Sequence, residues 1–325
     1  MNIDIHAHAL PQDTLEALRD AAPQFPGVKL VEADGKFQLS FAGNTPTRPV
    51  MPGLRLTAPR LDWMGERDID VQLVSGWLDG FGYELEAEEG ADWSRFQNEN
   101  LMRVCAGSPK LTALATVPLQ SGKHAAAVLE EAVAAGMPGA MIGTQPEGGQ
   151  GNLDAEHLDP FWAKASELKV PVIVHPMFGS GDARLHDFQM MNAVGRVTDL
   201  TIAIARMLFS GHLIRFPDLV MVASTGGGAL PFALGRLMRN RDAFPDLVSD
   251  PREGFSKLYF DSLVFEPETL KFLVDKVGAE RIMLGSDYPF PIGDPAPTQV
   301  IENCDLNDAQ KVAIREGVAK RLFKL

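Results

Sequence analysis

The chain has 325 residues, of which 43 are acidic and 30 are basic, so its formal net charge is -13 at pH 7. This acidic surplus argues against nucleic acid or an anionic membrane surface as a partner. No apolar window reaches the roughly 18 to 20 residues of a transmembrane helix, and no signal segment precedes the first predicted strand. Only two cysteines occur, Cys105 and Cys304, so we expect a cytoplasmic protein with reduced thiols.

The chain opens with an apolar strand that ends in His6 and His8. Residues two apart in a strand point to the same face, so both imidazoles are expected to converge at the strand's end. Two imidazoles side by side make half of a transition-metal site, and a pair of surface histidines at a frayed terminus is the alternative. Ligands at the ends of later strands would favour the metal site.

After this strand, the sequence predicts a short helix and then a hairpin, which we interpret as an insertion over about residues 26–54. Short apolar strands then alternate with helices. The predicted helices span 12–22, 59–67, 91–106, 123–135, 158–168, 190–210, 230–238 and 267–277. The predicted strands after the first span 71–75, 114–117, 139–142, 172–175, 219–224, 258–260 and 282–284.

Eight short apolar strands interleaved with helices are typical of a parallel sheet that closes into a barrel and is covered by helices. We therefore predict an α/β protein with one (β/α)8 TIM barrel domain over residues 1–325. Active sites of such barrels lie at the C-terminal ends of the strands, where the βα loops begin. Residues at those ends are the candidates for chemistry.

Four side chains at three strand ends form a candidate metal site. His175 ends the fifth predicted strand and Asp287 follows the eighth, so with His6 and His8 they supply three imidazoles and one carboxylate. Taken alone, His175 would be a hydrogen-bonded core histidine. Together, these nitrogen and oxygen ligands favour one divalent metal, zinc or manganese, with open positions for water or substrate. Asp261, just after the seventh strand, is expected to hydrogen bond to a ligand or to the substrate.

The four other histidines do not lie at strand ends. His124 opens a predicted helix, His157 precedes one, His186 lies in a loop, and His212 lies between a helix and the next strand. Surface or helix-capping positions are expected for all of them.

Several motifs together resemble the amidohydrolase superfamily. They are His6-x-His8, Val174-His175-Pro176, the glycine turn 226–228 after the sixth strand, and the segment Leu-Gly-Ser-Asp-Tyr-Pro-Phe-Pro at 284–291. The similarity runs from the first strand to the end of the chain. Within the superfamily it is to the aminocarboxymuconate-semialdehyde decarboxylase branch, which also contains resorcylate and carboxyvanillate decarboxylases.

The resemblance implies a (β/α)8 barrel, one divalent metal, usually zinc or manganese, and non-oxidative loss of CO2 from an unsaturated or aromatic acid. The fourth strand, at 139–143, offers no lysine to carbamylate, which disfavours the binuclear hydrolases of the superfamily.

The resemblance also implies substrate-binding arginines. Arg48, on the insertion, matches an arginine that binds a substrate carboxylate, and a guanidinium suits a carboxylate because it donates two parallel hydrogen bonds. Arg236 matches a second arginine that the family supplies from the neighbouring subunit, which implies a homodimer. An ordinary surface charge is the alternative for either arginine. Trp77 and Phe290 are expected to contact the ring or diene of the substrate, with core packing as the alternative.

The chain departs from the family pattern at Thr225, which precedes the glycine turn where the family has a histidine that activates water or moves a proton. A threonine hydroxyl does not titrate near neutral pH, so it cannot act as a base there. Either the chemistry depends on the metal and Asp287 alone, or the reaction has changed, or the chain is inactive.

Three hypotheses follow. The first is a metal-dependent decarboxylase of a small carboxylic acid, in which Arg48 orients the acid and Asp287 delivers the proton that replaces CO2. The second is a metal-dependent hydrolase of an amide, ester or lactone, with Asp287 as the base. The third is a non-catalytic relative that binds metal and an acidic ligand. Release of CO2 separates the first from the other two.

Overall fold

Eight parallel strands form the centre of the computed structural model, which describes residues 1–177, 182–246 and 249–325. These eight strands fall into two hydrogen-bonded groups, one with the order β1-β4-β5 and one with the order β10-β9-β8-β7-β6. The strands are β1 (Ile3–Ala9), β4 (Val71–Gly76), β5 (Leu111–Ala113), β6 (Ala140–Gly143), β7 (Pro171–His175), β8 (Val220–Ala223), β9 (Tyr259–Asp261) and β10 (Ile282–Met283).

Backbone hydrogen bonds join the two groups at both edges and close the barrel. At one edge, the backbone N–H of Ala115 donates to Gly139 over 2.9 Å, and Met141 donates to Ala115 over 3.0 Å. At the other edge, Ile5 donates to Leu284 over 2.9 Å. The predicted (β/α)8 barrel is therefore confirmed, and its strands form a closed ring.

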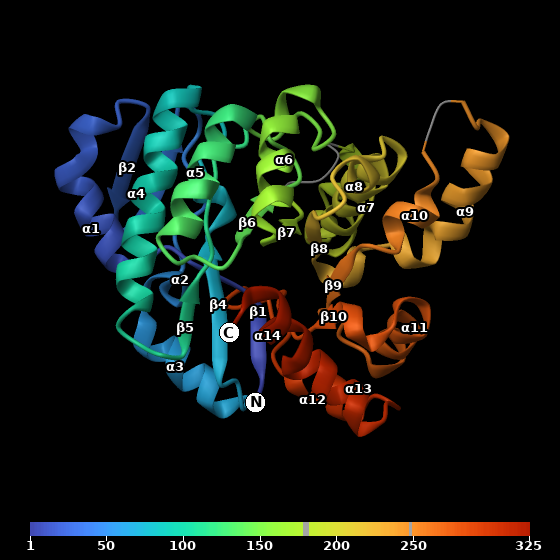
Figure 1. Ribbon diagram of the computed structural model, residues 1–325. Coiled ribbons are helices and arrows are strands. Elements are labelled where there is room, and N and C mark those ends of the chain that lie inside the picture. The colour runs from blue at the N-terminus through green and yellow to red at the C-terminus, as the bar shows by residue number, and fades with distance from the viewer. Residues whose placement is uncertain (178–181, 247–248) are drawn as a thin grey trace.

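Helices surround the strands (Figure 1). Because the helices cover the outside and the barrel interior is packed, both faces of a strand are buried, as the all-buried pattern of β7 shows. The helices that alternate with the barrel strands are α3 (Thr57–Glu66), α4 (Ala87–Cys105), α5 (Gly122–Ala134), α6 (Asp159–Leu168), α7 (Arg196–Phe209), α9 (Leu230–Ala243) and α11 (Pro267–Val277). Short helices α12 (Pro297–Asn303), α13 (Asp308–Val312) and α14 (Val318–Phe323) complete the C-terminal end.

The predicted insertion forms the antiparallel hairpin of β2 (Val28–Ala33) and β3 (Lys36–Phe41). Its two-residue turn is Asp34-Gly35, and both residues have positive φ, as the tight hairpin turn requires. Together with α1 (Gln12–Ala21) and α4, the hairpin lies at one edge of the molecule (Figure 1) and packs around its own apolar cluster, which includes Trp93. The segment after β3 leads back to the barrel mouth and carries Arg48 there.

One strand prediction was wrong in its position. The ladder forms at Leu111–Ala113 and not at 114–117, where only Ala115 makes an isolated bridge. The reason is a side chain: the amide of Asn98 donates to the carbonyl of Thr116 over 2.9 Å and accepts from its N–H over 2.8 Å. These bonds occupy the backbone groups that a strand would pair.

The helix predicted at 190–210 is interrupted near its start. A π-helical turn, Met191–Gly195, precedes the regular helix α7. In the described parts of the chain, none of the helices combines the length and the apolar character that crossing a membrane requires. Cys105 and Cys304 are both buried and unbridged.

Candidate metal centre

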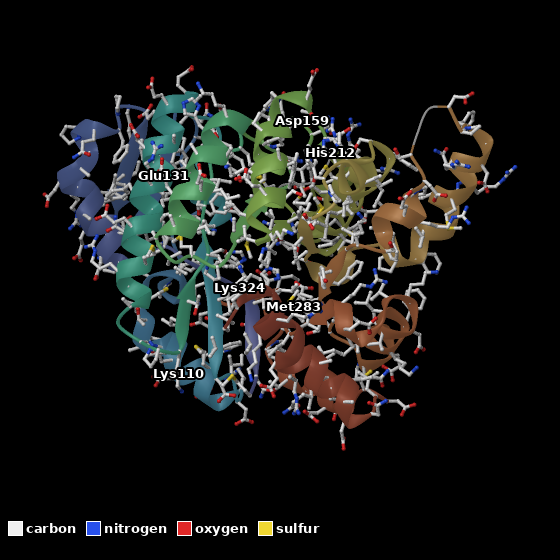
Figure 2. All side chains as sticks on the ribbon, viewed as in Figure 1. Lys110, Glu131, Asp159, His212, Met283 and Lys324 are labelled. Atoms are coloured by element: carbon white, nitrogen blue, oxygen red, sulfur yellow. The ribbon has the colours of Figure 1, made fainter. Side chains whose placement is uncertain are left out.

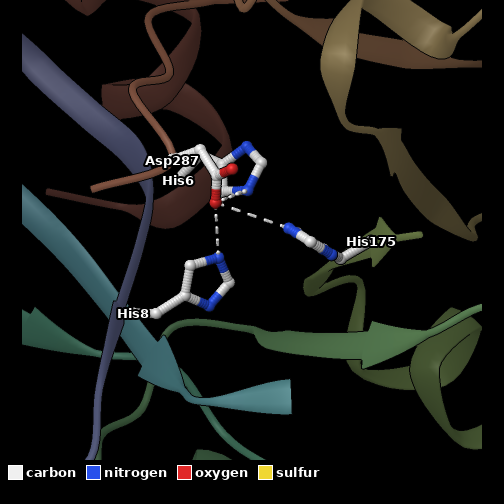
Figure 3. Close-up of side chains that lie close together, drawn as sticks. All are labelled: His6, His8, His175 and Asp287. Atoms are coloured by element: carbon white, nitrogen blue, oxygen red, sulfur yellow. Dashed lines mark ion pairs between the residues drawn. The ribbon is translucent and has the colours of Figure 1, made fainter. Parts of the chain in front are cut away.

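Four side chains from three distant parts of the chain meet at one end of the barrel (Figure 3). His6 and His8 come from β1, His175 is the last residue of β7, and Asp287 lies in the turn after β10. The Oδ1 atom of Asp287 lies 3.5 Å, 3.1 Å and 3.6 Å from Nε2 of His6, His8 and His175, respectively. One potential ligand atom from each residue lies within 4.8 Å of all the others. The structure thus brings all four predicted ligands together.

Hydrogen bonds outside the cluster orient the three imidazoles. Nδ1 of His6 and Nδ1 of His175 each donate to an oxygen atom that only accepts, and Nδ1 of His8 lies near the Gly76 carbonyl and the Ser75 hydroxyl, the latter at 3.0 Å. With Nδ1 bonded outside the cluster, Nε2 is the ring nitrogen that faces it. The acceptors are the Asp261 carboxylate for His6 at 2.7 Å, the Gly76 carbonyl for His8 at 3.2 Å, and the Pro176 carbonyl for His175 at 2.8 Å. Asp261 therefore acts on the cluster through His6.

The donor set fits a divalent metal. The Nε2 atoms of His6 and His8 and the Oδ1 atom of Asp287 are buried without a hydrogen-bond partner among the described residues. Buried polar atoms rarely lack a partner, and lone pairs that face one another need a cation between them. Three imidazoles and one carboxylate are ligands that zinc and manganese accept. The cluster is therefore a possible metal site.

Burial and mutual contact shift the pKa values of these residues. Burial lowers the pKa of His175 to about 3 and also lowers the pKa of His8, so both rings are neutral at pH 7. Burial opposes the charged form of His6, yet the Asp261 carboxylate bonded to it and the charge of Asp287 raise its pKa. Burial would raise the pKa of Asp287, but the neighbouring imidazoles of His175 and His8 lower it. An ionised carboxylate beside the neutral imidazoles of His8 and His175 suits a cation.

A cavity of about 640 Å³ opens beside the cluster and is lined in part by His175 and Asp287. Three of the four predicted substrate residues, Arg48, Trp77 and Phe290, also line it. Its volume is that of a small-molecule pocket.

Arg48, Trp77 and Phe290 differ in their contacts within the cavity. Arg48 makes a two-fold ion pair with Asp79, from Nε at 3.0 Å and from Nη2 at 3.2 Å. Trp77 is buried, and its indole N–H has no hydrogen-bond partner among the described residues. The ring of Phe290 lies 5.3 Å from the ring of His8. The cavity therefore offers a guanidinium, an indole donor and an aromatic face.

The fourth predicted substrate residue, Arg236, lies elsewhere. It is exposed on α9 and is not among the residues that line the cavity. Within one chain, the structure does not bring Arg236 to the cluster.

Thr225 begins the short turn Thr225–Gly227 after β8 and adopts a left-handed conformation with φ of +50°. This is unfavourable for a β-branched residue and is typical of functional sites. The next residue, Gly226, donates its N–H to Asp261 over 2.8 Å, so the turn contacts the residue that orients His6. Thr225 itself is not among the residues that line the cavity.

A polar group that the sequence patterns did not predict also lines the cavity. It consists of Gln189, which precedes the π-helical turn, Asn192, which lies in it, and Arg196, which begins α7. In sequence these residues come well after the end of β7, whereas the candidates for chemistry were expected directly at strand ends. The signal available in the sequence was the pair Asn192 and Arg196, four residues apart at the start of a predicted helix.

The surface position expected for His212 is wrong. His212 is 2% exposed, its Nδ1 lies 2.6 Å from the hydroxyl of Ser210, and its Nε2 lies 3.4 Å from Asp159 (Figure 2). The Ser210 hydroxyl satisfies Nδ1, and Nη2 of Arg215 donates to Nε2 over 2.8 Å, which allows the ring to be buried outside the cluster. His124 stands at the start of α5, and His157 and His186 are exposed, as expected.

The fold and the cluster define a (β/α)8 barrel protein with a possible metal site of three histidines and one aspartate at the C-terminal ends of its strands. More particularly, the chain belongs to the amidohydrolase family, whose model matches residues 3–325.

Similar proteins include several decarboxylases. The 2-amino-3-carboxymuconate-6-semialdehyde decarboxylase of Dictyostelium discoideum is 30% identical over 93% of this chain and 86% of its own length. The gamma-resorcylate decarboxylase of Rhodococcus jostii is 28% identical over 82% of this chain and 87% of its own length.

Solved structures share the fold. The superposition on the 5-carboxyvanillate decarboxylase of Sphingomonas paucimobilis covers 100% of this chain and 99% of that enzyme's chain. The TM-score is 0.82 and the sequence identity is 24%. The enzyme of the same name from Novosphingobium aromaticivorans, complexed with manganese, covers 100% of this chain and 96% of its own, with a TM-score of 0.81 and 18% identity.

Proposed function

We propose that this protein is a metal-dependent, non-oxidative decarboxylase of a small unsaturated or aromatic carboxylic acid, and that residues 1–325 act as one domain. The convergence of four ligand atoms beside a cavity that presents Arg48 carries the proposal. The similarity to decarboxylases along most of the chain supports it.

His6, His8, His175 and Asp287 would hold one divalent metal, with zinc as our first choice and manganese as the alternative. When bound, such a cation supplies positive charge that stabilises the electron density left as the bond to the carboxylate breaks. The hydrogen bond from His6 to Asp261 keeps the first ligand in orientation before any cation or substrate binds.

The remaining roles belong to residues around the cavity. Arg48 exchanges Asp79 for the substrate carboxylate, because both acceptors present two oxygens to the same guanidinium. Trp77 donates its indole N–H to a polar group of the substrate, and Phe290 packs against the ring or diene. Asp287, which is ionised at rest, takes up a proton from water at Oδ2 and passes it to the carbon that loses CO2, since Thr225 supplies no titratable group.

We also propose a homodimer in which Arg236 reaches the cavity of the neighbouring chain. Arg236 is exposed on α9 one turn after Phe232, whose side chain is 85% exposed. Aromatic residues and arginine are enriched in protein interfaces, and an exposed phenylalanine next to an arginine fits one.

The experiment is CO2 release after reconstitution with zinc or manganese. The acids to supply are 2-amino-3-carboxymuconate 6-semialdehyde, 2,6-dihydroxybenzoate and 5-carboxyvanillate. A His8→Ala chain should lose both metal and CO2 release, whereas His124→Ala, outside the cluster, should retain both. Hydrolysis of lactones or amides without any CO2 release by the metal-loaded protein would replace this proposal with a hydrolase.

A further inference from the structure

Arg196 is one of the residues that line the cavity beside the four candidate metal ligands. It is the first residue of α7 and follows the π-helical turn Met191–Gly195. Asn192, Ala193 and Arg196 all line the cavity, and their spacing places them on one side of a helical turn. Turns of the π type are frequent at functional sites, because the extra residue redirects side chains.

Two hydrogen bonds hold the guanidinium in place. Its Nε donates to the side-chain oxygen of Asn192 over 3.0 Å, and its Nη1 donates to the carbonyl of Pro176 over 3.3 Å. Both acceptors are uncharged, so neither of these two bonds cancels the positive charge. The Pro176 carbonyl also accepts from Nδ1 of His175, which links Arg196 to the backbone next to a metal ligand.

Arg196 and Arg48 line the same cavity. Burial lowers the pKa of Arg196, and the positive charge of Arg48 lowers it further, while the charges of Asp287, Asp79 and Asp199 oppose this shift. An arginine remains charged at pH 7 despite such a shift. Two guanidinium groups from different segments, one of them paired with Asp79, thus line one cavity beside the metal ligands.

We propose that Arg196 binds a second anionic group of the substrate, distinct from the carboxylate that Arg48 binds, so that the preferred substrates are dianionic acids such as dicarboxylates. This inference rests on the proposed function for the place of the reacting carboxylate. One carboxylate leaves as CO2, and the group bound by Arg196 stays on the product. Both cations come from the same chain, so this contact is separate from the one proposed for Arg236 of a neighbouring subunit.

The test compares two unreactive probes, benzoate and benzene-1,3-dicarboxylate, by titration calorimetry on the zinc-loaded protein. The dicarboxylate should bind about tenfold to a hundredfold more tightly than benzoate, as expected for one charge-assisted, bidentate contact. Arg196→Gln should abolish this difference and leave benzoate affinity unchanged, whereas Arg196→Lys should keep part of it. The control is Arg206→Gln on the same helix, since Arg206 pairs with Asp154 and does not line the cavity.

Two outcomes would overturn the inference. One is equal affinity of the unaltered protein for both probes, a result that needs no variant to fold. The other is a folded Arg196→Gln chain that retains the preference for the dicarboxylate. Failure of this inference can be distinguished from failure of the proposed function. A chain that binds the dicarboxylate through Arg196 but releases no CO2 contradicts only the decarboxylase assignment.

Discussion

The Nδ1 atom of His6 donates a 2.7 Å hydrogen bond to Oδ2 of Asp261, although 255 positions separate the two residues in the chain. Both side chains are fully buried. The other oxygen of Asp261 accepts the N–H groups of Gly226 at 2.8 Å and Leu263 at 3.2 Å. The carboxylate therefore connects the first strand of the barrel with the turns after β8 and β9.

Replacing Asp261 tests this connection. Asp261→Asn keeps the shape but removes the charge that makes the imidazole of His6 a stronger ligand, so zinc affinity should fall by about 10-fold to 100-fold. The measurement is competition with a chromophoric chelator. Asp159→Asn is the matched control, because Asp159 lies near the buried His212 outside the cluster. Equal zinc affinity in the Asp261 variant and the unaltered chain would show that the hydrogen bond has no effect on the metal.

Thr225 is the position where this chain lacks the family histidine. Thr225→His adds a titratable group to the turn whose next residue, Gly226, donates to Asp261, so the rate of CO2 release should be preserved or raised, by up to about 100-fold. Steady-state CO2 release from the aminocarboxymuconate, dihydroxybenzoate and carboxyvanillate substrates, with the metal content of each sample measured, checks this.

Thr225→Gly serves as the control for the backbone. Glycine tolerates the φ of +50° without strain, so this variant should be at least as stable as the parent and should not gain activity. A histidine variant that loses activity while the glycine variant keeps it would mean that the pocket requires a small side chain at this position.

Mixed dimers test the role of Arg236. An Arg236→Ala chain combined with a His8→Ala chain should regain one competent site per heterodimer, because the first keeps its metal ligands and the second supplies the arginine. Activity of the mixture is compared with that of each chain alone. In the control mixture, an Arg239→Ala chain takes the place of the Arg236→Ala chain, because Arg239 is an exposed arginine on the same helix. The absence of any recovery would leave Arg236 as a surface residue.

The stability of the metal-free protein should fall with decreasing pH. The pKa of His175 is about 3 in the fold and 6.5 ordinarily, so between these values the unfolded chain binds a proton that the folded chain does not. His8, whose pKa is also lowered, acts in the same direction, while the raised pKa of His6 opposes it. Each pH unit below 6.5 should cost up to about 1.4 kcal/mol per such imidazole.

Urea unfolding of the chelator-treated protein at pH 7.5, 6.5 and 5.5 measures this slope. His175→Gln should flatten it, because glutamine does not titrate, and His124→Gln should leave it unchanged. A slope that His175→Gln does not alter would assign the pH dependence to other groups.

The barrel and the four candidate ligands could be predicted from the order of residues alone. Alternation of apolar strands and helices is a local pattern, and the parallel barrel places the C-terminal ends of its strands at one face. His6, His8, His175 and Asp287 could therefore be grouped from their positions at strand ends. The strand predicted at 114–117 was misplaced because a side chain of α4, Asn98, binds the backbone there.

The surroundings of the ligands, in contrast, depend on how distant segments pack. A hydrogen bond from Asp261 to a ligand or to the substrate was expected, but that His6 is its partner, that Arg48 pairs with Asp79, and that Arg196 lines the cavity depend on contacts between segments far apart in sequence. No periodicity records such contacts, because each depends on the length and direction of loops and on a turn such as Met191–Gly195. The fold class determines where the end of a strand lies. The position of a loop residue, in contrast, is determined only when the whole chain has packed.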